Sequence, residues 1–265
     1  MQAAADLICS GFLFFKKFSS VRGLFCVNSS STPAVSSVIA SLSSLPDFDP
    51  RLVPVAGVDS HLPAVPLDRQ TPAALRERFA HPPVWQPEVV LEKRFMNREP
   101  AHASVLLAIF LREQPTVLLT ERTAHLSTHS GQVAFPGGRA DPEDATPADT
   151  ALREAYEEVG LAPEFVEVLG HSATYVTGSS FIITPVVGLV RPDCVLTPNP
   201  YEVADIFEVP LAFLLDPANH RRHVFNVDGV QREWFSMPYQ AGAKNHFIWG
   251  ATAGMLRNFY RFMLA

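Results

Sequence analysis

Residues 135–161 read FPGGRADPEDATPADTALREAYEEVGL, a stretch that holds a glycine pair, a helix start signal and three closely spaced glutamates. Thr146-Pro147 followed by Asp149 resembles a capping box with proline at the first helical position, which marks the start of a helix. Gly160 stands where the left-handed residue that ends many helices belongs. The sequence therefore predicts a tight turn at the glycine pair and a helix over 146–159.

The predicted helix has an apolar face and an acidic face. At about 100° per residue, one arc collects the apolar side chains Ala148, Ala151, Leu152, Ala155 and Val159. Glu154, Glu157 and Glu158 fall on the opposite side, where like charges three or four residues apart cost about 0.2–0.5 kcal/mol per contact. Arg153 is the only basic residue within the helix. Six carboxylate oxygens on one face favour a hard divalent cation, Mg²⁺ or Mn²⁺, over zinc.

The glycine pair Gly137-Gly138 allows the backbone to approach a ligand without a Cβ in the way. We expect a carbonyl or N–H there to join the metal or phosphate shell. The alternative is an acid-rich helix whose charges are simply solvated, which is the usual meaning of a charge run. Seven Gly, Arg and Glu letters at fixed spacing arise by chance on the order of 10⁻⁸ per start position, which favours a functional site.

This stretch resembles the Nudix box, the loop-helix signature of hydrolases that cleave nucleoside diphosphates linked to another group. The family pattern has five residues between its Gly and a first Glu, then seven before its Arg. Here five residues separate Gly138 from Asp144, eight separate Asp144 from Arg153, and Asp replaces the Glu. The resemblance implies that Arg153 orients the glutamates through a carboxylate in the preceding loop.

The resemblance also implies the roles of the glutamates. Glu154 and Glu158 would hold Mg²⁺ or Mn²⁺, and Glu157 would be a further metal ligand or the general base. The catalytic residues are then Glu154, Glu157 and Arg153, and the identity of the base stays open. Glu202 is expected to be a surface carboxylate, with an approach to the metals from another loop as the alternative.

A second block over 118–138, LLTERTAHLSTHSGQVAFPGG, is similar to the motif of one subgroup, the coenzyme A pyrophosphatases. Ser127 departs from the subgroup, which usually carries Arg there. The resemblance implies a substrate that is coenzyme A or an acyl-CoA, cut to 3′,5′-ADP and (acyl-)4′-phosphopantetheine. Its phosphates need cationic or donor groups, and the residues expected to bind them are Arg122, His129, Gly137, Gly138 and Arg139, with His125 as a further candidate.

Two other functions remain open at this stage. One is a Nudix hydrolase that acts on another nucleoside diphosphate derivative, such as ADP-ribose. The other is a non-catalytic Nudix module that binds a nucleotide. The intact glutamate cluster argues against the second, because a pure binder has little reason to keep repelling carboxylates on one face.

The rest of the chain predicts an α/β layered fold, because strand-like and helix-like segments interleave without an internal repeat. We expect strands over 103–111, 116–120, 181–190 and 232–237, helices over 71–79, 209–215 and 249–263, and a loop over 126–138. The last helix is expected to be amphipathic, with Trp249, Phe259 and Tyr260 in the core. The family resemblance implies an α/β/α sandwich with a mixed sheet in a single domain.

Domain organisation follows from a change in composition near residue 45. Residues 46–265 are expected to form the hydrolase domain. Residues 1–45 are Ser-rich and poor in acids, and are expected to be a disordered or over-annotated extension, with an organelle transit peptide as the alternative.

Charge and composition exclude some functions. The formal net charge of −6 argues against a nucleic-acid coat, which needs a basic surface. No apolar run reaches the roughly 18 residues that span a bilayer, so no membrane association is expected. Three widely spaced cysteines fit a reducing compartment, which predicts a cytoplasmic protein. An oligomer is neither predicted nor excluded.

Overall fold

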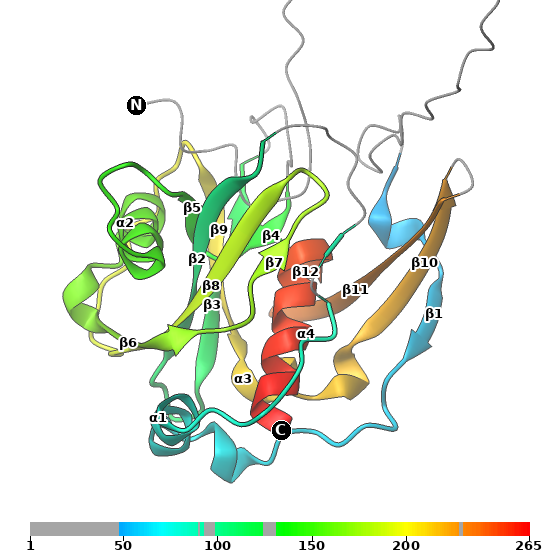
Figure 1. Cartoon of the computed structure of the whole chain (residues 1–265), viewed down its shortest axis with the longest axis horizontal. Coiled ribbons are helices and arrows are strands. Elements are labelled where there is room, and N and C mark those ends of the chain that lie inside the picture. The colour runs from blue at the N-terminus through cyan, green and yellow to red at the C-terminus, as the bar shows by residue number, and fades with distance from the viewer. Residues whose placement is uncertain (1–47, 90, 93–98, 124–130, 228–229) are drawn as a thin grey trace, which may run out of the picture.

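The computed structural model describes residues 48–89, 91–92, 99–123, 131–227 and 230–265 (Figure 1). The predicted extension over residues 1–45 lies outside these ranges. Within them, no helix combines the length and the apolar character that a membrane crossing requires.

The described chain forms two β-sheets and four α-helices. The larger sheet contains β2 (Ala101–Phe110), β3 (Thr116–Arg122), β4 (Val133–Ala134), β5 (Gly137–Arg139), β6 (Val166–His171), β7 (Tyr175–Val176), β8 (Phe181–Val190) and β9 (Val203–Pro210). The smaller sheet contains β1 (Val55–Val58), β10 (Arg221–Val227), β11 (Val230–Ala241) and β12 (Lys244–Trp249). The helices are α1 (Pro72–Ala80), α2 (Pro147–Val159), α3 (Leu211–Leu214) and α4 (Gly250–Leu264).

The larger sheet is mixed. Its central pair, β2 and β8, is parallel over residues 101–110 and 181–190, while its other pairings are antiparallel. The smaller sheet is antiparallel throughout, in the order β1-β10-β11-β12. The predicted mixed α/β fold is therefore confirmed.

The elements stack in layers, with α2 against one face of the larger sheet and α4 against the other (Figure 1). Strand β2 explains this arrangement. Its residues Leu106, Ala108 and Phe110 pack with α2, while Val105, Leu107 and Ile109 pack with α4. A strand covered on both faces is a continuous apolar run, as this one is in the sequence. The smaller sheet covers the far side of α4 and adds a layer that the sequence did not predict.

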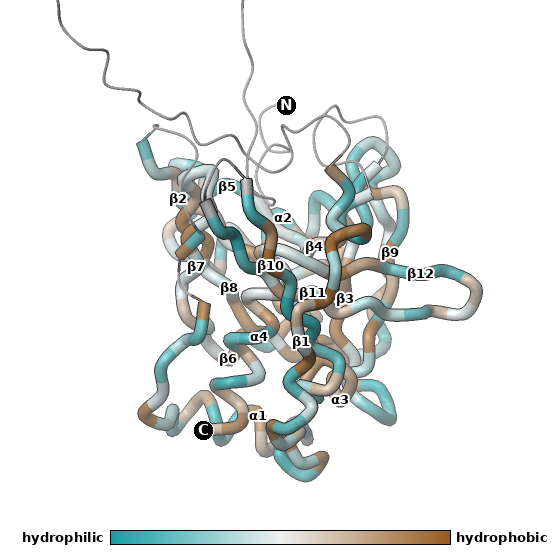
Figure 2. The backbone as a smooth tube through the Cα atoms, turned by 90° about the vertical axis from the view of Figure 1, so that its right-hand side faces the viewer, coloured by the Kyte–Doolittle hydropathy of each residue, from teal (hydrophilic) through white to brown (hydrophobic). Residues whose placement is uncertain are grey.

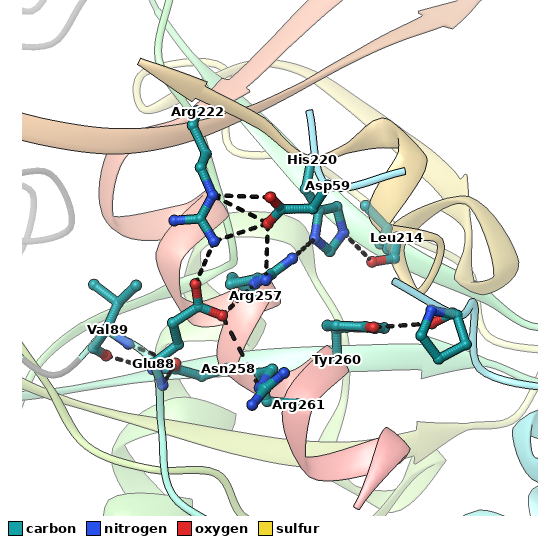
Figure 3. Close-up of polar contacts among 11 residues, drawn as sticks. Asp59, Glu88, Val89, Leu214, His220, Arg222, Arg257, Asn258, Tyr260 and Arg261 are labelled. Atoms are coloured by element: carbon teal, nitrogen blue, oxygen red, sulfur yellow. Dashed lines mark hydrogen bonds and ion pairs between the residues drawn. The ribbon is translucent and has the colours of Figure 1, made fainter. Parts of the chain in front are cut away.

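The predicted closing helix is present as α4 with Phe259 and Tyr260 in the core, but it is buried on nearly every side rather than along one apolar face, and Trp249 is only partly buried. It lies between the two sheets, and even its polar residues Thr252, Arg257 and Asn258 are enclosed. Arg257 ion-pairs with Asp59 and Glu88, and Arg222 of β10 contacts the same two carboxylates (Figure 3). His220 completes this charged cluster by accepting a hydrogen bond from Arg257 over 3.1 Å. The cluster joins α4 to the smaller sheet and to the chain that precedes the larger one.

Local signals located several elements correctly. Helix α2 begins at a complete capping box on Thr146 and ends at Gly160 in the left-handed conformation, as predicted. Strand β8 has the predicted bounds. The expected loop over 126–138 was partly wrong, because its described part contains β4 and the start of β5. The helix expected over 209–215 is shorter, because its first two residues belong to β9.

Candidate active site

Strand β5 brings the glycine pair beneath α2. Gly137 and Gly138 pair with Val105 and Ser104 of β2. A Cβ on Gly137 would lie 2.4 Å from the Ser104 carbonyl oxygen, and a Cβ on Gly138 would lie 2.2 Å from the carboxyl carbon of Glu154. Both positions therefore depend on glycine, the first to pair with β2 and the second to leave room for a carboxylate of α2.

Glu154 and Glu158 are buried, which corrects the expectation of a clean acidic face opposite the core. Only 2% of Glu154 and 6% of Glu158 is exposed. Four residues apart on α2, both carboxylates lie on the side of the helix that covers β5. The backbone N–H of Gly137 donates a 3.2 Å hydrogen bond to Oε2 of Glu158. The glycine strand and the two carboxylates thus form one enclosed unit.

Burial raises the pKa of both carboxyls. The pKa of Glu154 rises to about 7, despite the opposing charge of Arg153 and with further upward contributions from Glu157 and Glu202. Burial likewise raises the pKa of Glu158 to about 8, although the N–H of Gly137 opposes the rise. Two buried carboxyls that resist ionisation form a site where an added cation is strongly favoured.

Arg153 connects α2 to the loop before it. Its Nε and Nη2 donate to the two carboxylate oxygens of Asp144 over 3.1 and 2.9 Å, and Nη2 also donates to the Arg139 carbonyl over 3.0 Å. Its Nη1 donates to Glu154 over 3.0 Å and to Glu157 over 3.4 Å. The bidentate bond lowers the pKa of Asp144 to about 2. The expected contact between Arg153 and a loop carboxylate is therefore present. Arg153 also donates to Glu154, so it connects the Asp144 carboxylate to the Glu154 carboxylate.

The predicted metal ligands do not all lie in the same environment. The Glu157 side chain is half exposed, unlike those of Glu154 and Glu158. In the described ranges, no three acidic, histidine or cysteine side chains are grouped so that they could hold a metal ion. The donor chemistry still fits a hard divalent cation, because Glu154 and Glu158 offer carboxylate oxygens whose charge is poorly compensated.

The residues expected to bind substrate differ in their burial and in whether the structure describes them. Arg122 lies at the end of β3, is buried, and its positive charge lowers the pKa of Glu158. The Arg139 side chain is exposed, and its carbonyl is the group that contacts the site. His125 and His129 lie outside the described residues, so their placement stays a prediction.

Glu202 belongs to the site more closely than the sequence suggested. Its charge raises the pKa of both Glu154 and Glu158. A turn holds it in place, because the Asn199 N–H donates to the Glu158 carbonyl over 2.8 Å and the Glu202 N–H donates to the Asn199 carbonyl over 3.1 Å. No local signal marks this residue, since only the docking of its turn onto the end of α2 brings it near.

Comparisons with known proteins agree with this geometry. Residues 100–226 match the model of the NUDIX domain. A Photorhabdus laumondii protein named uncharacterized Nudix hydrolase NudL is 45% identical over 155 residues, which cover 58% of this chain and 81% of that protein. The chain belongs to the Nudix hydrolase family. A Yersinia enterocolitica protein of the same name is 44% identical over 156 residues, covering 59% of this chain and 78% of its own.

Solved Nudix structures also match part of the chain. The M. smegmatis Nudix hydrolase RenU is 29% identical, covers 46% of this chain and 78% of its own, and has a TM-score of 0.36. Membership of the family means that this Nudix hydrolase cleaves nucleoside diphosphate derivatives, which are small-molecule nucleotide substrates, and Nudix hydrolases generally use divalent metal ions.

Proposed function

We propose that this Nudix hydrolase cleaves the diphosphate of coenzyme A or an acyl-CoA in the presence of Mg²⁺ or Mn²⁺. The products would be 3′,5′-ADP and (acyl-)4′-phosphopantetheine. The observation that supports the proposal is the enclosed unit of Gly137, Glu154 and Glu158 at the end of the block over 118–138. That block carries the resemblance to the coenzyme A subgroup, and its Arg122 lies close enough to influence Glu158.

The reaction needs water to attack a phosphorus that negative oxygens already surround. A divalent ion, when bound, supplies charge neutralisation and an acidified water. Glu154 and Glu158 are the buried residues that would hold it, with Glu157 at the exposed margin as a further ligand or base. Burial leaves their ionised forms without enough local positive charge, which favours binding of the cation.

The other residues of the site would act by position. Arg153 fixes the Glu154 carboxylate, and Asp144 fixes Arg153 in turn through a bidentate bond. Such supporting contacts orient metal-binding groups and protect their geometry. Arg122 is buried beside Glu158 and would contribute positive charge toward a phosphate of the substrate.

A substrate screen tests the proposal. The purified chain is incubated with Mg²⁺ or Mn²⁺ and with coenzyme A, acetyl-CoA or ADP-ribose, and the release of 3′,5′-ADP or AMP is measured. We expect 3′,5′-ADP from the CoA species. The Glu158→Gln variant should lose activity by on the order of 100-fold or more. The matched control is Glu164→Gln, which alters an exposed glutamate just beyond α2 and should leave the rate unchanged.

Two results would contradict the proposal. Brisk hydrolysis of ADP-ribose without turnover of any CoA species would assign the chain to another nucleotide substrate. Binding of CoA, measured as a rise in melting temperature, without turnover of any substrate would favour a non-catalytic module.

A further inference from the structure

Strand β3 ends beside the candidate site. Its last residue is Arg122, whose positive charge lowers the pKa of Glu158. The pairing of β3 with β9 shifts in register between Glu121 and Arg122, so the regular ladder is interrupted just before the arginine. A register shift of this kind re-aims the side chains next to it and is common beside active sites. The direction of Arg122 therefore depends on how Glu121 is held.

Glu121 is the middle residue of a row of three that crosses the larger sheet. It pairs with Val133 of β4 on one side and with Asp205 of β9 on the other. On the same two strands, Leu119 and Phe207 belong to the core on the α4 side of the sheet, and each lies two residues from a member of the row. Because side chains alternate along a strand, Glu121 and Asp205 also point to that side. The row therefore faces the smaller sheet.

One short segment, residues 244–252, contacts every member of this row. The segment comprises β12 and the start of α4, and Figure 2 shows β12 close to β3, β4 and β9. Its three contacts join Nζ of Lys244 to Oδ2 of Asp205 over 2.6 Å, Nδ1 of His246 to Oε2 of Glu121 over 3.2 Å, and the Thr252 hydroxyl to the Val133 carbonyl over 3.0 Å. The segment thus holds three neighbouring strands at the level where the register shifts.

The contact between His246 and Glu121 is enclosed. Only 1% of the His246 side chain is exposed, and its ring stacks on that of Phe207 with 3.6 Å between the ring centroids. An ionised carboxylate only accepts hydrogen bonds, so Nδ1 of His246 is the donor. The contact between Lys244 and Asp205 differs, because 66% of the Lys244 side chain is exposed and such surface pairs contribute little. His246 is therefore the residue best placed to hold the end of β3.

We propose that His246 is a positioning residue of this hydrolase, because its contact with Glu121 holds the end of β3 so that Arg122 stays directed at the site. His246 acts through Arg122 and not on the substrate itself. It lies beyond residues 100–226, the range that matches the family model, so the smaller sheet contributes to the geometry of the site from outside that range. This role rests on the one proposed for Arg122, and it does not depend on which nucleoside diphosphate derivative is cleaved.

Two substitutions of His246 separate positioning from stability. His246→Asn keeps a nitrogen donor at the place of Nδ1 and gives up the ring that stacks on Phe207. His246→Phe keeps a stacking ring and gives up the donor. We expect His246→Asn to melt at a lower temperature and to retain most of kcat/KM. His246→Phe should melt close to the parent and lose about 10-fold in kcat/KM. Activity that simply follows melting temperature in both variants would overturn the proposal.

A double-mutant cycle with Arg122→Ala tests whether His246 acts through Arg122. Rates are measured on the substrate that the parent chain hydrolyses fastest. Once Arg122 is replaced, His246→Phe should change kcat/KM by less than about 2-fold, because the group that it positions is gone. A loss of the same size in both backgrounds would overturn the proposal. Full activity of Arg122→Ala would overturn it as well, together with the role proposed for Arg122.

His223→Phe is the matched control. His223 is a second buried histidine of the smaller sheet, and its ring stacks on that of Trp234. Its ring nitrogens contact the Val53 carbonyl and the Ser236 hydroxyl, so this substitution also removes buried hydrogen bonds but leaves the row on the larger sheet untouched. We expect kcat/KM of His223→Phe to equal that of the parent.

Hydrogen exchange supplies a readout that needs no turnover. The N–H of Arg122 donates to the Gln132 carbonyl over 3.0 Å, and the N–H of Thr123 donates to the Glu202 carbonyl over 3.1 Å. Both amides should exchange faster in His246→Phe than in the parent, His246→Asn and His223→Phe. Equal exchange in all four proteins would contradict the proposal. Failure of the parent to cleave any CoA species would instead contradict only the proposed substrate, because the exchange measurement involves no substrate.

Discussion

The carboxylate of Glu154 occupies the space where a side chain on Gly138 would begin. A Cβ there would fall 2.2–2.4 Å from the three carboxyl atoms of Glu154, and the atoms that must move are the tip of a flexible side chain. The Glu154 carboxylate can therefore hold its position only because residue 138 has no side chain.

Gly138→Ala should displace Glu154 with little cost to the fold. We expect the rate of hydrolysis to fall by about 100-fold, because a misplacement of about 1 Å at a reacting centre costs that much. The melting temperature should change little. Gly137→Ala is the informative contrast, since its Cβ would meet the backbone of β2, and it should destabilise the chain by about 1–3 kcal/mol. Loss of stability in both variants to the same degree would contradict this distinction.

Asp144→Asn should reduce activity by about 10–100-fold while leaving the buried carboxylates in place. The amide removes the negative charge that accepts two hydrogen bonds from Arg153. Arg153 is then no longer fixed in place, and its contact with Glu154 is weakened. Measurement of kcat at saturating Mg²⁺ checks this effect. Asp141→Asn is the matched control, because its carboxylate lies 3.8 Å from Arg153 and is mostly exposed. The control should retain most of the activity.

Mg²⁺ should stabilise the chain more at alkaline than at acidic pH. The pKa values of Glu154 and Glu158 rise from 4.5 to about 7 and about 8, so the metal-free folded state binds more protons than the unfolded chain in that window. Its free energy of unfolding therefore falls as pH rises from about 4.5 to 8. A bound cation compensates the ionised carboxylates. The rise in melting temperature caused by Mg²⁺ should thus be small at about pH 5 and large at about pH 8.5.

Glu158→Gln provides the control for that measurement. Without metal it should be more stable than the parent at alkaline pH, because it removes a buried charge, and its response to Mg²⁺ should shrink. An equal Mg²⁺ response at both pH values, or in both proteins, would contradict the assignment of the cation to these carboxylates.

Acid should weaken the fold through His220. Its Nδ1 accepts from Arg257 and its Nε2 donates to the Leu214 carbonyl, so the neutral ring satisfies both contacts. Burial lowers the pKa of His220 from 6.5 to about 4, so the folded state resists protonation. Stability that is present above pH 6.5 is lost as pH falls toward 4, and the pKa difference corresponds to about 3 kcal/mol. Denaturant unfolding across that range should show this loss, and His220→Gln should flatten the slope.

Local sequence signals were sufficient for α2 but not for the environment of its glutamates. The capping box and Gly160 lie next to the helix in the sequence, so its bounds could be predicted. The burial of Glu154 and Glu158 depends on β5 running beneath the helix, whereas periodicity alone assigned them to the face opposite the core. The contact between Asp144 and Arg153 could be predicted because the family resemblance supplied it.

The smaller sheet was predicted only in part: the expected strand over 232–237 lies within β11, but β1 joins the sheet from a distant part of the chain. Val55 pairs with His223, and neither segment carries a local mark of that pairing. The same sheet explains the error over the last helix, since enclosure by a second layer buries residues such as Arg257 and Asn258 that hydropathy alone places in water. Glu202 was undervalued for the same reason, because the turn that delivers it docks on α2 from another part of the sequence.

The charged cluster around Arg257 links the range matched by the family model to the segments on both sides of it. Residues 100–226 match the family model, and Arg222 lies within that range. Its counter-charge Asp59 lies before the range. Asp59 also pairs with Arg257 of α4, which lies after the range. A gene segment trimmed to the matched range and fused elsewhere would carry Arg222 without its counter-charges Asp59 and Glu88, and would keep only β10 of the four strands of the smaller sheet. Recombination that transfers this catalytic unit intact must therefore move the flanking segments with it.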